Sequence, residues 1–126
     1  MLRPLQLMPL TIDDDQFAQL GRDNFERRLV KLIREAYPAE SADLSPADLS
    51  RLIWEQVRRA EVYGLSDELS AATFVMTAWL LGVDFDLTIP AMAQVLKAPE
   101  LSARSKAQAL ADFTQVVFAE LEAAAR

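Results

Sequence analysis

The chain has 126 residues, of which 52% are hydrophobic and 25% are charged. This length supports one hydrophobic core, and the composition is typical of a globular protein rather than a disordered one. Histidine and cysteine are both absent, and there are only 3 glycines. These absences exclude disulfides, His or Cys metal ligands, Ser-His and Cys-His nucleophile pairs, and glycine-rich phosphate loops. We therefore expect no cofactor, no metal centre and no enzymatic activity.

The formal net charge is −6, and most of the acidic excess lies in residues 61–126. Nucleic-acid affinity comes largely from Lys and Arg side chains that displace counterions, so we expect no nucleic-acid partner. The longest uncharged run, residues 69–83, is shorter than the roughly 20 residues that cross a bilayer. Residues 1–10 lack the apolar run and cleavage site of a signal peptide. These features predict a cytoplasmic protein without a membrane partner.

The predicted elements begin with an extended apolar arm, residues 1–10, because Pro4 and Pro9 interrupt any helix there. A first helix follows to about Ala36, where Tyr37-Pro38 ends it. One apolar stripe of helical period runs along it: Phe17, Gly21, Phe25, Leu29, Leu32 and Ala36.

A second helix is predicted over about residues 46–63. Ser45 is its cap, Pro46 occupies its first turn, and Gly64 ends it. Its apolar stripe is Leu49, Leu52, Ile53, Val57, Ala60 and Tyr63. A third helix runs from the capping segment 66–68 to about Leu81, a loop covers residues 82–90, and a short helix covers 90–97. A long final helix starts after Ser102.

The third predicted helix is apolar on nearly every side. We place Leu69, Thr73, Met76 and Leu80 on one face and Val75 and Trp79 on another. A helix of this kind is expected to be surrounded by other helices. The predicted fold is therefore all-α, a single-domain bundle over residues 11–126 with four longer helices, one short helix and the third helix central.

Asp84 and Asp86 flank Phe85 in the predicted loop. Two carboxylates close together can divide acid and base roles, as they do in glycosidases. A small enzyme that uses this pair is one hypothesis. The other interpretation is a pair of turn or capping acids around an anchoring Phe, and we favour it because no other polar groups converge on the loop.

The second predicted helix carries the most suggestive surface. Trp54 lies at the edge of its apolar stripe, beside Arg51 and Arg58. Trp and Arg dominate binding hot spots, so we predict that these three residues contact a protein partner. The alternative is that Trp54 packs on a neighbouring helix while Arg58 lies over its ring as a cation–π pair.

Two further segments are candidates for contact with a partner. The arm is too apolar for a free tail, so Leu5, Leu7 and Met8 are expected to lie in a groove of their own bundle or to dock on another chain. On the first helix, Arg27, Lys31 and Arg34 form an outward strip, with Arg28 nearby. The strip is either a solvated face with intrahelical ion pairs or a contact for an acidic partner.

Several short motifs occur in order along the chain. They are Pro9–Ile12 with Gln16-Phe17, Tyr63–Leu65 before a long apolar helix, Leu81–Asp86, a short helix that ends at Leu96, and a final helix entered through Lys106. In this order and spacing the chain resembles small helical proteins encoded in bacterial type VI secretion effector clusters, beside toxins, toxin adaptors and PAAR-domain spike proteins.

This resemblance implies a non-enzymatic co-adaptor, or accessory chaperone, that helps to load a toxin onto its spike. Its partner would be the adaptor, the toxin or the spike protein, and no catalytic residues come with the family. An immunity protein that neutralises a cognate toxin is the alternative, since an acidic surface suits a basic nuclease cleft. A homodimeric scaffold also stays open.

Overall fold

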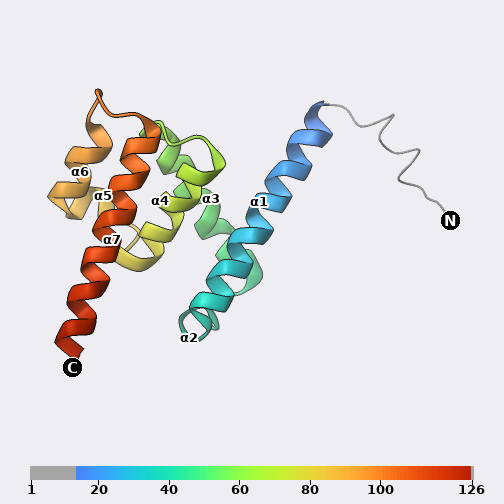
Figure 1. The fold of residues 1–126 in the computed structure, drawn as a ribbon. Helices are drawn as coiled ribbons and strands as arrows, with labels where there is room; N and C mark the ends of the chain where they lie inside the picture. The colour runs from blue at the N-terminus through green and yellow to red at the C-terminus, as the bar shows by residue number, and fades with distance from the viewer. Residues whose placement is uncertain (1–13, 126) are drawn as a thin grey trace.

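The computed structural model describes the backbone of residues 14–125 and the side chains of residues 21–117, 119, 120, 123 and 124. The described residues form seven helices and no strand, which confirms the predicted all-α class (Figure 1). The helices are α1 Asp14–Ala36, α2 Pro38–Ser41, α3 Pro46–Val62, α4 Glu68–Leu81, α5 Phe85–Thr88, α6 Pro90–Lys97 and α7 Ala103–Ala125. The predicted arm, with Leu5, Leu7 and Met8, lies outside the described residues.

The predicted caps set the helix ends. The Ser45 hydroxyl accepts a hydrogen bond of 3.1 Å from the backbone N–H of Asp48 at the start of α3. The Asp67 carboxylate accepts one of 3.1 Å from Ser70 at the start of α4. Such side chains satisfy backbone donors that have no partner within the helix. After α3, Gly64 has a φ of 85°, a left-handed conformation that favours glycine and turns the chain toward α4.

Two one-turn helices, α2 and α5, occur where no helix was predicted, α2 after the first predicted helix and α5 within the predicted loop 82–90. A single turn is too short to show a period of 3.6 residues, so the pattern of apolar residues does not reveal it. The helix count is therefore higher than predicted, with three short helices instead of one among the described residues. Phe85, at the start of α5, is fully buried, as expected of an anchoring residue.

Among the described residues, the hydrophobic core forms two clusters, and α4 contributes to both. Ala71 and Val75 of α4 join the cluster with α1 and α3: Phe25, Leu29, Ile33, Leu49 and Ile53. Phe74 and Ala78 join the other cluster: Ala60, Leu65, Phe85, Met92, Leu96, Ala107 and Leu110. Both α1 and α7 contact α4, and they lie on different sides of it (Figure 1).

Two predictions about burial were wrong. On α1, Ile33 is fully buried and Leu32 is 47% exposed, because Phe25, Leu29 and Ile33 succeed one another at steps of four residues and turn Leu32 to the edge of the packed face. On α4, Leu69 is 76% exposed, and Thr73, Met76 and Leu80 are half-buried. The predicted surrounding of α4 is thus incomplete on the face that carries these four residues.

Candidate interaction surfaces

Asp84 and Asp86 bind the α4–α5 connection to the end of α3. The side chain of Asp86 is only 2% exposed, and its two oxygens pair with the Arg59 guanidinium and accept a hydrogen bond of 2.6 Å from the Tyr63 hydroxyl. Arg59 also donates to the Val83 carbonyl at 2.6 Å and pairs with Asp84 at 3.3 Å. The carboxylates are therefore engaged in structural contacts with α3, although Asp84, at the first capping position of α5, makes no capping hydrogen bond through its side chain.

The contacts among Arg59, Tyr63 and Asp86 persist at neutral pH because neither donor loses its proton there. Burial raises the pKa of Tyr63 to about 12, and its hydrogen bond to the negative Asp86 adds to the effect. Desolvation alone would lower the pKa of Arg59, but hydrogen bonds and charges from Asp86 and Asp84 raise it overall. Both groups thus keep the protonated forms that donate to Asp86 at neutral pH.

Arg59 and Tyr63 were not predicted from the sequence as partners of these acids, although Tyr63 belongs to the predicted apolar stripe of α3. The one available signal was their spacing. Residues four apart lie on the same side of a helix, so Arg59 and Tyr63 form a pair of donors that face the same acceptor.

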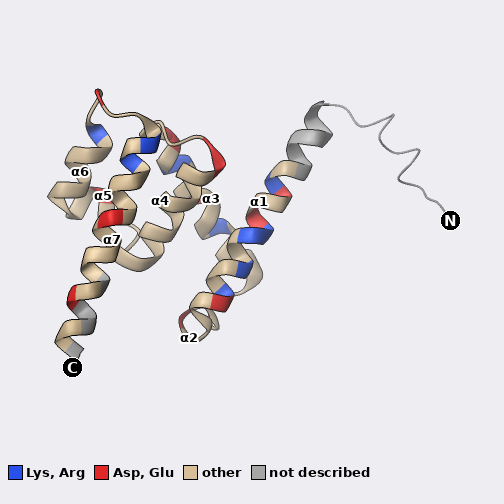
Figure 2. Ribbon diagram, viewed as in Figure 1, with Lys and Arg blue, Asp and Glu red and all other residues tan. Residues whose placement is uncertain are grey.

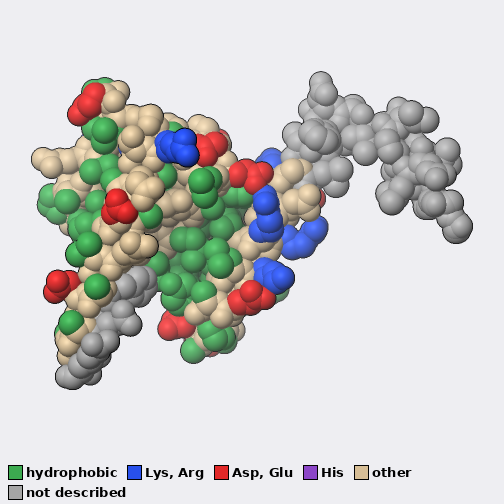
Figure 3. Space-filling model, viewed as in Figure 1, with side chains coloured by type: hydrophobic (Ala, Val, Ile, Leu, Met, Phe, Trp, Pro, Cys, Tyr) green, Lys and Arg blue, Asp and Glu red, His purple; other side chains and the backbone are tan. Residues whose placement is uncertain are grey.

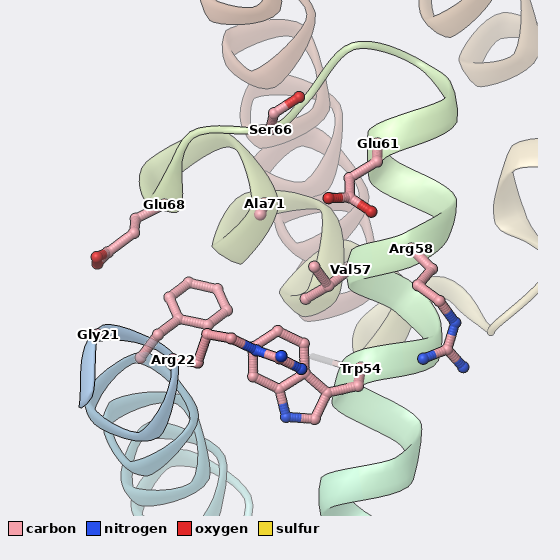
Figure 4. A pocket seen from close by; sticks show the side chains of 10 residues that line it. Gly21, Arg22, Trp54, Val57, Arg58, Glu61, Ser66, Glu68 and Ala71 are labelled. Carbon is pink, nitrogen blue, oxygen red and sulfur yellow. The ribbon is translucent and has the colours of Figure 1, made fainter. Parts of the chain in front are cut away.

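A cleft of about 500 Å³ lies between α1, α3 and the beginning of α4 (Figure 4), and we call it the Trp54 cleft. Phe25, Trp54 and Val57 contribute apolar walls, and Glu61 and Ser66 contribute polar groups. The Trp54 ring lies 5.8 Å from the Phe25 ring. Trp54 thus packs on the neighbouring helix α1, as one of the two sequence interpretations proposed.

The polar contacts of Trp54 come from α1. Its indole N–H donates to Glu26 Oε1 at 2.5 Å, which satisfies the only donor of a half-buried Trp. The Arg22 guanidinium carbon lies 4.7 Å from the centre of the Trp54 ring. The cation over the ring is therefore Arg22 rather than the expected Arg58.

The three residues predicted to contact a partner from α3 do not share one site. Arg58 lines the Trp54 cleft, and Figure 4 shows its guanidinium group pointing away from the Trp54 ring. Arg51 is not among the lining residues and forms an exposed ion pair of 2.7 Å with Asp48. The structure brings together Trp54 and Arg58 and leaves Arg51 elsewhere on α3.

The basic strip of α1 divides into inward and outward residues. Arg34 is half-buried and donates to the backbone carbonyls of Ser41 and Leu44, the latter at 2.8 Å. The prediction that Arg34 points outward was wrong, because the turn after α2 leaves carbonyls that need donors. Arg27 and Lys31 are exposed, as expected.

The remaining basic residue, Arg28, pairs with Glu68 at the start of α4. Arg27 donates to the side chain of Asn24 at 3.2 Å. Basic residues thus recur along α1, where Figure 2 colours several segments of the ribbon blue.

One face of α4 is partly exposed beside the core. It carries Leu69, Thr73, Met76 and Leu80, and we call it the open face. Figure 3 shows an apolar hollow between α1 and α7, and both basic and acidic side chains lie on the outer part of α1 beside it. A cavity of about 330 Å³ at its α1 side is lined by Leu29, Leu32, Leu69 and Ala72, among other residues. The sequence predicted which residues share this face but not that the described part of the chain leaves it uncovered.

Within the described part of the chain, no group of three or more acidic residues is arranged to hold a metal ion. No described helix has the length and apolar character needed to cross a bilayer. Comparisons of the chain with protein-family models, with curated proteins and with solved structures find no match.

Proposed function

We propose that this chain is a non-enzymatic protein-interaction module that acts in the cytoplasm as a co-adaptor in type VI secretion. It helps the toxin adaptor to hold a toxin for loading onto the spike. The observation that carries the proposal is the open face of α4, where Leu69 is 76% exposed beside half-buried Met76 and Leu80. In this proposal α4 is the central helix of the bundle, and a bound segment completes the ring of helices around it.

The energetics of the open face support binding. Full burial of a Leu or Met side chain contributes about 1.5–3 kcal/mol. Leu69 gives up most of this contribution in the free chain because it lies largely in water. A contiguous apolar area next to charged residues is typical of protein-binding surfaces. A partner that buries the exposed Leu69 side chain therefore gains the stabilisation that folding alone does not provide.

The co-adaptor role within this class rests on the resemblance to proteins of secretion effector clusters. A co-adaptor that binds only the loaded complex stabilises it by mass action, without any chemical step. This mechanism needs a surface that binds protein and no reactive group. It agrees with carboxylates at Asp84 and Asp86 that are already paired with Arg59.

Co-expression tests the proposal. The tagged chain is produced with the toxin, the adaptor and the spike protein encoded beside it, and the complex is isolated. We expect Leu69→Glu to abolish co-purification with the adaptor or the toxin. Val62→Glu is the matched control, since Val62 is 81% exposed on α3 outside the open face. Unchanged complexes with Leu69→Glu would contradict the proposal.

The same co-expression separates the co-adaptor from the immunity protein. A co-adaptor leaves the toxin active in the recipient cell, whereas an immunity protein protects a cell that produces the toxin when no adaptor is present. Growth of toxin-producing cells that contain this chain alone would favour immunity. Trp54→Ala and deletion of residues 1–10 test whether the Trp54 cleft and the arm belong to the same interface.

A further inference from the structure

Resting on the proposed function, we propose that the segment bound at the open face is a single amphipathic α-helix of the partner protein, with acidic residues along the flank that meets α1. It lies between α1 and α7 and packs its apolar stripe on Leu69, Met76 and Leu80.

The shape of the surface favours one helix. The floor residues Leu69, Thr73, Met76 and Leu80 follow the spacing of a helical ridge, which a second helix fills with side chains at similar spacing. Leu69 and Leu80 are 11 residues apart, so the floor is about 17 Å long at 1.5 Å per residue. About three turns of helix match this length.

The concave shape of the hollow also disfavours a symmetric contact between two copies of this chain. In a two-fold dimer the same patch meets itself. Here α1 and α7 stand on either side of α4, so the patch is concave (Figure 3). Two concave patches cannot bring their floors into contact, whereas a separate helix can enter the hollow.

The charges at the two edges give the partner its chemistry. On the α1 side, Arg27, Arg28 and Lys31 line an open depression of about 420 Å³ with Asn24 and Glu68. Glu68 already pairs with Arg28, while Arg27 and Lys31 are exposed. On the other side, residues 107–125 of α7 include no Lys or Arg. A helix in the hollow is therefore best matched by Asp or Glu toward α1.

Three fluorescent peptides, two of them stapled and each with the 14-residue length of α4, test this inference. All carry leucines at the spacing of the floor residues. The first has glutamates along one flank, the second has lysines there instead, and the third is the glutamate peptide with a central proline in place of the staple. Fluorescence anisotropy measures their binding to the full chain.

We expect the glutamate peptide to bind at least about tenfold more tightly than the lysine peptide, and the proline peptide not to bind. Leu69→Glu should weaken binding at least about tenfold, and Val62→Glu should leave it unchanged. The double variant Arg27→Glu, Lys31→Glu should reverse the preference between the two charged peptides. Equal or tighter binding of the lysine peptide by the wild-type chain would overturn the inference.

Other occupants give distinct results. If the arm fills the hollow, deletion of residues 1–10 raises peptide affinity and a synthetic peptide of residues 1–13 competes. If a second copy fills it, sedimentation equilibrium shows a dimer that Leu69→Glu dissociates. Either result overturns the inference.

Co-purification and peptide binding together distinguish failure of the acidic-helix site from failure of the proposed function. Loss of adaptor or toxin co-purification with Leu69→Glu, together with no binding of the glutamate peptide, refutes the acidic helix and retains the interaction module. Peptide binding with unchanged co-purification supports the helix site and refutes the proposed function.

Discussion

The two sides of α4 have similar composition and opposite environments. Phe74 and Ala78 face a closed core and are 0% and 1% exposed, whereas Leu69 on the open face is 76% exposed. The closed side is held by the neighbouring helices and by the paired carboxylates after α4. Among the described residues, none covers the open side to the same extent. An apolar side chain on this helix therefore indicates a contact surface, but it does not indicate whether the contact lies within the same chain.

The largest expected difference in stability is between a substitution on the closed side of α4 and one on its open face. Phe74→Ala should reduce the free energy of unfolding by about 3–5 kcal/mol, because it leaves a cavity in a packed core. Leu69→Ala should change it by less than about 0.5 kcal/mol, as surface substitutions do. Urea denaturation followed by circular dichroism measures both. Similar losses in the two variants would show that the open face is covered in solution.

The next largest difference is expected between the two carboxylates that hold the closed side, Asp86 and Asp84. Asp86→Ala should destabilise the fold by about 3 kcal/mol, because it leaves Arg59 and Tyr63 without their shared acceptor. Asp84→Ala should cost less than about 1 kcal/mol, because this carboxylate is largely exposed and pairs with Arg59 at 3.3 Å. The same denaturation experiment applies, and an equal cost for both acids would refute the assigned roles.

A smaller effect concerns Tyr63 and depends on pH. Its pKa is 10.0 in the unfolded chain and about 12 in the folded one, so the neutral phenol stabilises the fold below pH 10 and this contribution is lost as the pH rises toward 12. Tyr63→Phe should cost about 1–2 kcal/mol at neutral pH. The variant should also lose less stability than the wild type between pH 9 and 11 in thermal unfolding. Parallel alkaline profiles would contradict this assignment.

The smallest effect lies in the Trp54 cleft. Arg22→Ala should cost about 0.5–1 kcal/mol, because it removes the cation over the Trp54 ring. Arg58→Ala is the control from the same cleft and should change stability by less than about 0.5 kcal/mol. Denaturation followed by tryptophan fluorescence distinguishes them. A larger cost for Arg58→Ala would restore the cation–π pair predicted from the sequence.

Much of the fold was predictable because its signals are local. Ser45, Gly64 and Pro90 mark helix ends through hydrogen bonds and backbone conformations that involve near neighbours only. The one-turn helices α2 and α5 were missed because a single turn shows no periodicity. Local chemistry thus predicted where the longer helices begin and end.

The candidate surfaces were less predictable because they depend on packing between distant parts of the chain. Asp86 meets Arg59 and Tyr63, which precede it by more than 20 residues. Arg22 rather than Arg58 reaches the Trp54 ring because α1 packs across α3. The open face was misjudged because an apolar residue predicts burial against something, and the sequence does not say whether that partner belongs to the same chain.

The most direct test of the central claim compares two methionines, Met76 on the open face and Met92 in the core, which is 3% exposed. In the free chain with ¹³C-labelled methionine methyl groups, a soluble gadolinium chelate should broaden the Met76 signal and spare Met92. Addition of the adaptor or toxin should then protect Met76. Equal protection of both methyl groups in the free chain would contradict the claim that this side of α4 is open to a partner.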